Sequence, residues 1–265
     1  MKLLYEPTDP TDIARAGPGP LGDDNPRTTG GPPFPVATTF NPLTSFTTDP
    51  VHGVWASDPL WTPPADGGAV SSWRNGGSVG TPNFTQATGT KQPTYRASTA
   101  GYNNKPTVQS DGTDDFLASN FADLTQPIWV VLLGNYGSTS GTRYLCDAHT
   151  VQSHIIYNNS GTKNAMYAGS ALGTSVDTNT NPNLHVCKFN GASSTYQLNG
   201  TTIASGNAGA VGMDGATIFA RAGGSTTAGA GHIAYYAVFT SDPTAQTEWA
   251  AFKAWCLSFY GITVA

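Results

Sequence analysis

Apolar and polar residues alternate over short runs along most of this chain, and clusters of Gly, Asn, Asp, Ser and Pro separate the runs. Short alternating runs with a turn signal at each end are typical of a β-sandwich or barrel. The run at 127–136, PIWVVLLGNY, is almost entirely apolar and predicts a central strand buried on both faces, with a turn at Gly134 and Asn135. Further strands are expected at 143–147, 154–157, 164–167, 184–189, 195–198, 216–221 and 232–240, with hairpin turns at Asn190-Gly191 and Asn199-Gly200.

The segment at 104–119, NKPTVQSDGTDDFLAS, combines a strand, a tight acidic turn and a second strand. Asp111 and Gly112 form a strong turn signal, because Gly tolerates a positive φ at no steric cost. Asp114 and Asp115 are adjacent in the second strand, so their side chains are expected on opposite faces and at most one can face the interior. We expect the rest of the chain to fold against this hairpin.

The last element of the chain is predicted to be a helix over 242–260. Asp242 can cap it, Pro243 suits the first helical position, and Gly261 is a stop signal. The residues expected on its apolar stripe are Ala245, Trp249, Phe252, Cys256 and Phe259, at intervals of 4, 3, 4 and 3. This stripe is expected to pack against the sandwich.

Residues 1–50 differ from the rest of the chain, because they are rich in Pro and Gly and show no period of 2 or 3.6. Such a segment buries too little apolar surface to offset its ordering entropy. It could be a flexible linker or an extended assembly arm that becomes ordered along neighbouring subunits. Scattered apolar residues favour the arm; the expected anchors are Leu3, Leu4, Tyr5, Ile13, Leu21, Phe34, Phe40 and Phe46.

Composition narrows the class of protein further. The chain has 265 residues, 31 Gly and only 11% charged residues, which favours one all-β domain with an appendage. The net charge of −5 offers no basic stripe for nucleic acid, and no apolar run approaches the ~20 residues that span a bilayer. The N-terminus lacks the apolar region of a secretory signal, so we expect a protein made in a cytoplasm. Cys146, Cys187 and Cys256 are predicted to be buried free thiols.

Several motifs, taken in order, resemble one family. WRNGGSVG at 73–80 is similar to a W-x-D-x-S-G-x-G loop, although Arg74-Asn75 replaces the acidic position, and QPTY at 92–95 matches a Q-P-x-Y link. SDGTDDFL at 110–117 resembles an F-D-G-x-D-D-x-L signature, and 184–203 and 248–261 resemble a hairpin and a closing helix that ends in Y-G. These are features of concanavalin A-like, laminin-G-like jelly-roll domains of tailed-bacteriophage virion proteins, and the resemblance covers 51–265.

The resemblance implies an all-β, concanavalin A-like jelly-roll sandwich at 51–265 with one C-terminal helix, preceded by the extended arm at 1–50. It also implies a structural protein of a tailed-phage virion, located in the virion. The expected protein is a minor tail or tail-tip protein of the host-attachment type, with a carbohydrate-binding-like domain. Its partners would be other virion proteins through the arm, a host-surface glycan, and other copies of itself in a homo-oligomer. The alternatives are a capsid decoration protein whose arm laces capsid subunits, and a cell-envelope polysaccharide hydrolase.

Catalysis has little support in the sequence. Glycoside hydrolysis ordinarily uses two carboxylates, and retaining enzymes of this fold carry them in an E-x-D-x-x-E strand pattern. The chain has only two glutamates, Glu6 and Glu248, so the pattern cannot form and we expect no enzyme. Asp111, Asp114 and Asp115 are interpreted as turn residues, with a calcium or other hard-cation site as the alternative. No other cofactor is expected.

Binding of a sugar has better support. Sugars are recognised by aromatic rings against their apolar faces and by polar groups for their hydroxyls. The candidate ligand-binding residues are Tyr136, Tyr144, Tyr157, Asn158 and Asn159. The alternative is that the Asn residues only form turns and that the Tyr residues only pack against neighbouring strands.

Overall fold

The computed structural model of the chain describes residues 40–265 other than 79–81, 161 and 225–228. The chain divides into two units, residues 1–39 and 40–265, and all described residues belong to the second unit. Six of the expected arm anchors therefore lie outside the described residues: Leu3, Leu4, Tyr5, Ile13, Leu21 and Phe34.

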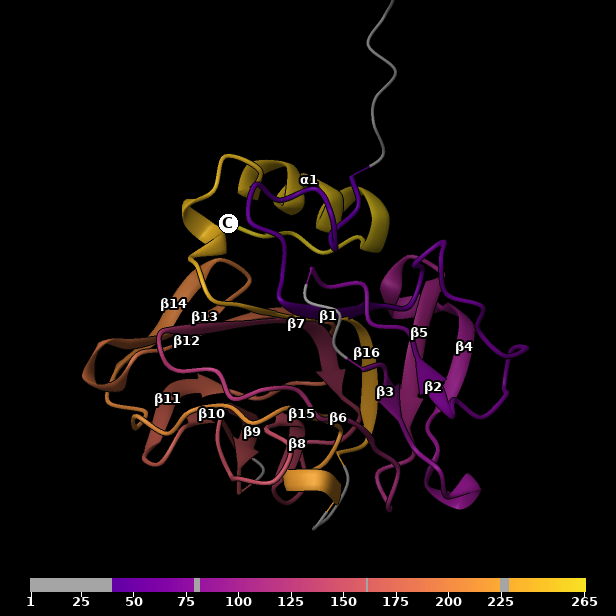
Figure 1. The fold of residues 1–265 in the computed structure, drawn as a ribbon, viewed down its shortest axis with the longest axis horizontal. Helices are drawn as coiled ribbons and strands as arrows, with labels where there is room; N and C mark the ends of the chain where they lie inside the picture. Colours follow the sequence, from indigo (N-terminus) through magenta and orange to yellow (C-terminus); the bar gives the residue numbers. More distant parts are fainter. Residues whose placement is uncertain (1–39, 79–81, 161, 225–228) are drawn as a thin grey trace, which may run out of the picture. The chain divides into compact units, whose positions relative to one another are not determined.

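The second unit contains two antiparallel sheets, as Figure 1 shows, and the expectation of an all-β fold is confirmed. Sheet A has the order β14 (Thr201–Gly206), β13 (Ser194–Leu198), β12 (Asn183–Phe189), β7 (Ile128–Tyr136), β16 (Gly231–Phe239), β5 (Lys105–Ser110) and β4 (Thr94–Thr99), and β1 (His52–Trp55) also pairs with β16. Sheet B has the order β11 (Ala171–Asp177), β10 (Lys163–Tyr167), β9 (Ile155–Asn159), β8 (Arg143–Asp147), β15 (Ala216–Ile218), β6 (Leu117–Ser119), β3 (Phe84–Thr85) and β2 (Ser72–Trp73).

Strand β7 is central and buried along its whole length, as its apolar run predicts. It lies between β12 and β16, and its side chains alternate between two apolar clusters. The predicted turn at Gly134 and Asn135 is wrong, because β7 continues through Tyr136. Gly134 fits inside the sheet because a Cβ there would lie 2.8 Å from the carbonyl oxygen of His232. The Asn135 side chain accepts hydrogen bonds from the His232 backbone N–H at 3.1 Å and from the Tyr102 hydroxyl at 2.8 Å.

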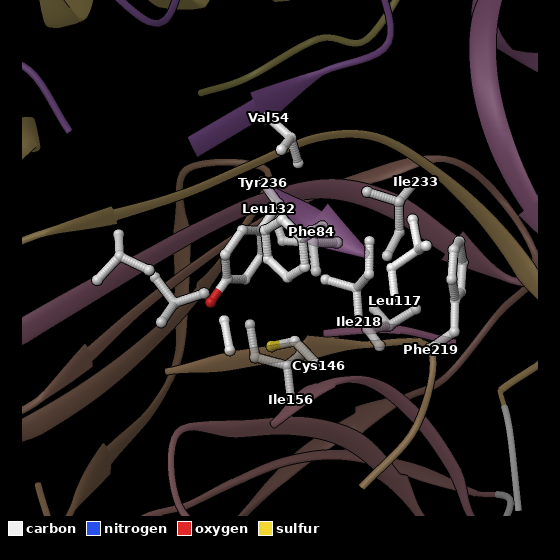
Figure 2. Packing of buried hydrophobic residues seen from close by; sticks show 14 of the residues in the cluster. Val54, Phe84, Leu117, Leu132, Cys146, Ile156, Ile218, Phe219, Ile233 and Tyr236 are labelled. Atoms are coloured by element: carbon white, nitrogen blue, oxygen red, sulfur yellow. The ribbon is translucent and has the colours of Figure 1, made fainter. Parts of the chain in front are cut away.

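One apolar cluster fills the space between the two sheets. Figure 2 shows Leu132 and Tyr236 from sheet A facing Cys146, Ile156 and other residues of sheet B. The second cluster lies on the other face of sheet A, where α1 (Trp249–Tyr260) packs over the strands (Figure 1). Covering both faces of sheet A explains why its central strand contains no alternation of apolar and polar residues.

The segment at 104–119 does not form the predicted hairpin. Strand β5 belongs to sheet A and β6 to sheet B, so the acidic turn carries the chain from one sheet to the other. The turn is held locally: the Asp111 N–H donates to Asp115 Oδ2 at 3.0 Å, and the Thr113 N–H donates to Asp111 Oδ1 at 2.7 Å. Gly112 adopts φ +81°, as the turn signal requires. Of the two adjacent carboxylates, Asp115 is the buried one.

The C-terminal helix is shorter than predicted. Asp242 Oδ1 accepts from the Thr244 N–H at 2.9 Å and begins only a single 3₁₀ turn, Pro243–Ala245. Gln246 then returns to an extended conformation with ψ 148°, and its side-chain oxygen accepts from the Thr48 N–H at 2.8 Å. Helix α1 therefore begins at Trp249, and Gly261 ends it with φ +73°.

Residues at the beginning of the second unit pack against α1. Phe46 is buried and lies 5.7 Å from the ring centroid of Phe252, and Phe40 lies 6.1 Å from the same ring. Phe40 and Phe46, which were assigned to the arm, thus contribute to the packed part of the chain. The division of the chain at residue 50 stays a prediction.

The three cysteines are buried and free, which confirms the prediction of unpaired thiols. Among the described residues, α1 and the shorter helical turns are not long and apolar enough to cross a membrane.

Candidate functional site

The outer face of sheet B carries a surface pocket of about 240 Å³. Its lining comes from β8, β9, β10 and β11, from the loop before β9 and from the segment after β15, and consists of Tyr144, Gln152, Ile155, Tyr157, Tyr167, Ala171 and Arg221. Each tyrosine is adjacent in sequence to a core residue, namely Leu145, Ile156 or Met166. Strand alternation therefore turns the three tyrosines away from the core and toward solvent.

Tyr144 and Tyr157 form the centre of the pocket. They are directly opposite each other in the pairing of β8 with β9, so the sheet itself brings their rings together. The ring centroids are 5.9 Å apart and the ring planes differ by 19°. Both side chains are half-buried, which leaves part of each ring accessible. Burial, with the nearby Tyr144 and Tyr167, raises the pKa of Tyr157, so its hydroxyl is protonated and can donate a hydrogen bond at neutral pH.

Arg221 adds a positive charge to the same pocket. Its guanidinium carbon lies 5.5 Å from the centroid of the Tyr144 ring, within the range of a cation–π contact. Its Nε atom is buried and has no hydrogen-bond partner among the described residues. No ion pair among the described residues includes Arg221, so the terminal N–H groups of its guanidinium can serve a ligand.

Asp147 positions the rim of the pocket. This buried carboxylate accepts from the N–H groups of Ala148 at 2.7 Å and Ser153 at 2.9 Å through Oδ1, and from the Ala222 N–H at 2.9 Å through Oδ2. It thereby joins the loop that contains Gln152 to the segment that contains Arg221. Burial raises the pKa of Asp147 to about 7, although the three backbone N–H groups and the nearby charge of Arg221 oppose the shift. Asp147 lies below the pocket and is not part of its lining.

The structure brings together two of the five predicted ligand-binding residues, Tyr144 and Tyr157. Tyr136 is buried in the core with 2% of its surface exposed. Asn158 is also buried, and its Oδ1 accepts from the Arg143 N–H. Asn159 is exposed at the end of β9 and is not part of the pocket lining.

Sequence reasoning missed Tyr167 and Arg221. A signal for Tyr167 was present, because it is the outward residue of the next predicted strand and antiparallel neighbours align their outward residues. Arg221 carried no comparable signal: it was placed at the end of a strand that in fact stops at Ile218. Its approach to Tyr144 depends on how the chain leaves β15.

The acidic turn is a second place where chemistry could occur. One carboxylate oxygen from each of Asp111, Asp114 and Asp115 lies within 4.8 Å of the others. Burial raises the pKa of Asp115 to about 6, and the negative charges of Asp111 and Asp114 add to the shift while the hydrogen bond from the Asp111 N–H opposes it. These oxygens could hold a hard cation such as calcium, which stays a prediction.

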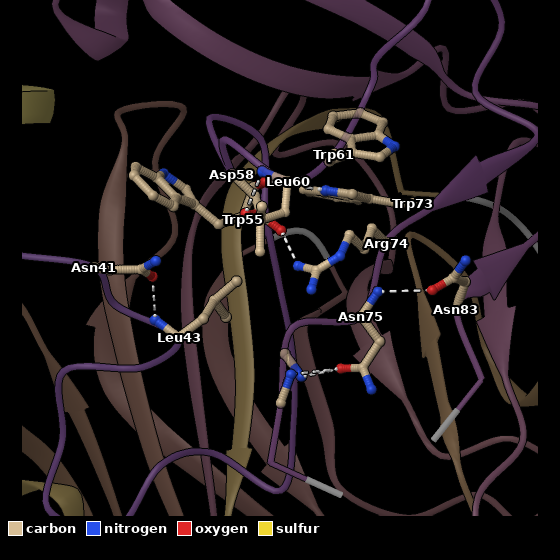
Figure 3. Close-up of polar contacts among 12 residues, drawn as sticks. Asn41, Leu43, Trp55, Asp58, Leu60, Trp61, Trp73, Arg74, Asn75 and Asn83 are labelled. Carbon is tan, nitrogen blue, oxygen red and sulfur yellow. Dashed lines mark hydrogen bonds and ion pairs between the residues drawn. The ribbon is translucent and has the colours of Figure 1, made fainter. Parts of the chain in front are cut away.

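A further pocket, of about 390 Å³, lies beside Trp61 and Arg74. Figure 3 shows that Arg74 points to Asp58, with which it forms an ion pair at 2.5 Å, and that Asn83 Oδ1 accepts from the Asn75 N–H. The Trp61 indole donates to the Ser72 carbonyl at 3.1 Å. The cation of this pocket is therefore already neutralised, in contrast to Arg221.

Fold and pocket together define an all-β sandwich with an aromatic, positively charged pocket on one outer face. The sequence matches no protein-family model and no curated protein. Among solved structures it is similar to the Trypanosoma rangeli sialidase, with 11% identity over 81% of this chain and 33% of that chain and a TM-score of 0.49. The same sialidase in complex with 2-keto-3-deoxy-D-glycero-D-galacto-2,3-difluoro-nononic acid gives 13% identity, 82% and 33% coverage, and a TM-score of 0.50. At this identity the likeness shows the fold alone, and the chain spans about a third of the sialidase length.

The prediction of a structural protein of a tailed-phage virion is wrong, because a solved structure that shares this fold is a sialidase. The prediction that the chain is not an enzyme is wrong on the same finding: this sandwich occurs within an enzyme, so a missing E-x-D-x-x-E pattern does not decide the matter. The motifs misled because they report turns and strands, which unrelated functions share. The expected virion location and partners rested on the same resemblance and stay predictions.

Proposed function

We propose that this chain binds carbohydrate in the pocket formed by Tyr144, Tyr157, Tyr167 and Arg221. The observation that carries the proposal is the pair of nearly parallel, half-buried rings of Tyr144 and Tyr157. The apolar C–H face of a sugar ring packs on such aromatic surfaces, while the sugar hydroxyls need nearby donors and acceptors. The tyrosine hydroxyls, Gln152 and Arg221 supply these groups around the pocket.

The finer description of the fold is part of the same proposal. Two eight-stranded antiparallel sheets packed face to face are compatible with the concanavalin A-like jelly roll to which the motifs at 73–80 and 110–117 point. The sialidase likeness supports a sandwich that occurs within glycan-processing proteins. In that setting this chain would provide sugar recognition.

Hydrolysis of a glycan is the second candidate function. The observation that favours it is the buried Asp115 carboxyl, whose pKa is raised to about 6 and which lies close to the carboxylates of Asp111 and Asp114. One protonated and one ionised carboxyl are the groups that glycoside hydrolysis ordinarily uses. We favour binding, because none of these three residues lines the pocket with the tyrosines and no carboxylate does so in its described lining.

One experiment tests both candidates. The purified protein is applied to an array of neutral and acidic oligosaccharides, and every ligand found is titrated by isothermal calorimetry. We expect Tyr157→Ala to weaken binding about tenfold or more, since it removes half of the stacking surface. Leu60→Ala is the matched control, because Leu60 is 70% exposed and does not line the pocket.

Release of reducing ends in the same mixtures measures hydrolysis. Release that is lost in Asp115→Asn and retained in Asp123→Asn would establish the second candidate, since Asp123 is exposed and outside the acidic turn. Binding that survives Tyr157→Ala at full strength would contradict the assignment of the pocket.

A further inference from the structure

Arg221 is the charged residue in the described lining of the pocket, and its charge is not part of an ion pair among the described residues. In the described part of the chain, the ion pairs are Arg74 with Asp58 and Lys163 with Asp177, and neither includes Arg221. Its Nε atom is buried without a hydrogen-bond partner among the same residues. A buried donor without a partner is costly in a folded protein, so such a group calls for an explanation.

The charge of Asp147 interacts with that of Arg221, but the two side chains form no ion pair among those described. Asp147 is fully buried, and its two oxygens already accept three backbone N–H groups. Burial raises the pKa of Asp147, while its backbone hydrogen bonds and the charge of Arg221 oppose the shift, so Asp147 is already held by partners of its own below the pocket. The described lining of the pocket contains no acidic residue, although the whole chain has a net charge of −5. The pocket is therefore a local positive site on an acidic protein.

We infer that this pocket selects a sugar that carries a carboxylate, which Arg221 binds while the ring of the sugar packs on Tyr144 and Tyr157. The inference rests on the proposed function and names its ligand class. A guanidinium matches a carboxylate through two parallel N–H···O bonds, and Tyr144 at 5.5 Å helps to orient it.

A carboxylate fits the site better than a phosphate group does. Phosphate sites usually combine several donors, such as backbone N–H groups at a helix N-terminus or a second cation. Here the pocket offers one guanidinium surrounded by tyrosines, which suits a single negative charge attached to a ring with an apolar face. Uronic acids and nonulosonic acids are the two sources of this chemistry among sugars.

The experiment compares each acid with a neutral counterpart by calorimetric titration. An oligogalacturonide is paired with its methyl ester, and sialyllactose is paired with lactose, so that the two sources are distinguished. We expect at least one acid to bind about tenfold or more tightly than its counterpart, which is the order of strength of a charge-assisted bidentate contact. We also expect added salt to weaken binding of the acid and to leave the neutral ligand unaffected.

The variants assign the preference to Arg221. Arg221→Gln should reduce the affinity for the acid to that for the neutral ligand, and Arg221→Lys should retain a smaller preference. Arg74→Gln is the matched control, because Arg74 lines the other pocket and pairs with Asp58. If Arg221→Gln fails to fold, the Arg221→Lys variant and the salt dependence of the wild-type protein still decide the matter.

The outcomes separate this inference from the proposed function. Acidic and neutral sugars that bind equally well would overturn the inference and leave carbohydrate binding in place. An acid preference that persists unchanged in Arg221→Gln would also overturn it. Failure of every sugar to bind the folded wild-type protein would overturn both.

Discussion

The outer faces of the two sheets both carry aromatic side chains, but these side chains have different surroundings. On sheet A, Trp55 and Tyr235 lie beneath α1, where the Trp55 indole donates to the Tyr260 hydroxyl at 2.9 Å and Tyr235 lies 5.7 Å from the Phe252 ring. On sheet B, Tyr144 and Tyr157 remain half-buried beside a cavity of about 240 Å³. The first face is part of the core, and the second is open to a ligand.

The contrast shows how one architecture provides both stability and recognition. Covering an aromatic face with a helix removes apolar area from water and stabilises the fold. Leaving adjacent aromatic rings partly exposed forgoes that gain, and rings grouped around an unpaired arginine are typical of a binding site. A single exposed aromatic residue would need no such explanation.

Acid should have the largest effect, because it acts on several buried or partly buried histidines at once. Burial lowers the pKa of His154 and His185 to about 3 and that of His52 and His232 to about 4, from 6.5. Between those values the unfolded chain binds more protons than the folded one, so stability falls as the pH decreases below about 6.5. Asp147 and Asp115 act in the opposite direction, because their pKa values of about 7 and about 6 exceed 3.8 in the folded state.

Because four histidines oppose two carboxyls, the folded protein should lose stability between pH 7 and pH 4.5. Thermal melts across this range measure the loss. His154→Asn should make the pH dependence less steep by about one proton, and Asn suits the φ of +58° at this position. Equal melting temperatures at pH 7 and 4.5 would contradict the prediction.

Removal of the contact between α1 and sheet A should have the next largest effect on stability. Only 5% of the Trp255 surface is exposed, and the centroid of its ring lies 5.6 Å from that of Trp55. Trp255→Ala should lower the free energy of unfolding by about 3–5 kcal/mol, because the cavity is bounded by large rigid rings. Chemical denaturation measures this change. Leu257→Ala on the same helix is the control, with 53% of Leu257 exposed, and a comparable loss there would refute the assignment of the packed face.

The existence of the C-terminal helix was predicted from the sequence more accurately than the set of residues that it buries. The spacing of Ala245, Trp249, Phe252, Cys256 and Phe259 marked a narrow stripe. In the structure Ala245 precedes the helix, Phe252 and Cys256 are buried as predicted, and Trp255 and Tyr260 are buried as well. The buried surface is broader because residues 40–48 also pack on α1, and a periodic pattern within one helix does not reveal a neighbour from a distant part of the chain.

The candidate site was predictable only in its strand residues. Alternation places Tyr144 and Tyr157 on one face, but it does not tell which face a helix will cover. Tyr136 illustrates the difficulty, because it is a strand tyrosine like the other two and lies between the sheets. The acidic turn illustrates a second difficulty. Asp111-Gly112 indicates that the chain reverses its direction, but it does not indicate whether the next strand joins the same sheet.

The smallest effect on stability is expected on the open face, and it sharpens the comparison most directly. Tyr157→Ala should lower the free energy of unfolding by less than about 1.5 kcal/mol, because the ring is only half-buried and little cavity remains. The same substitution should reduce sugar binding about tenfold or more. Trp255→Ala should show the reverse pattern when it is assayed at a temperature where it is folded. If instead Tyr157→Ala destabilised the protein as much as Trp255→Ala, the outer face of sheet B would be a structural surface, and its exposed rings would then require a covering partner instead of a ligand.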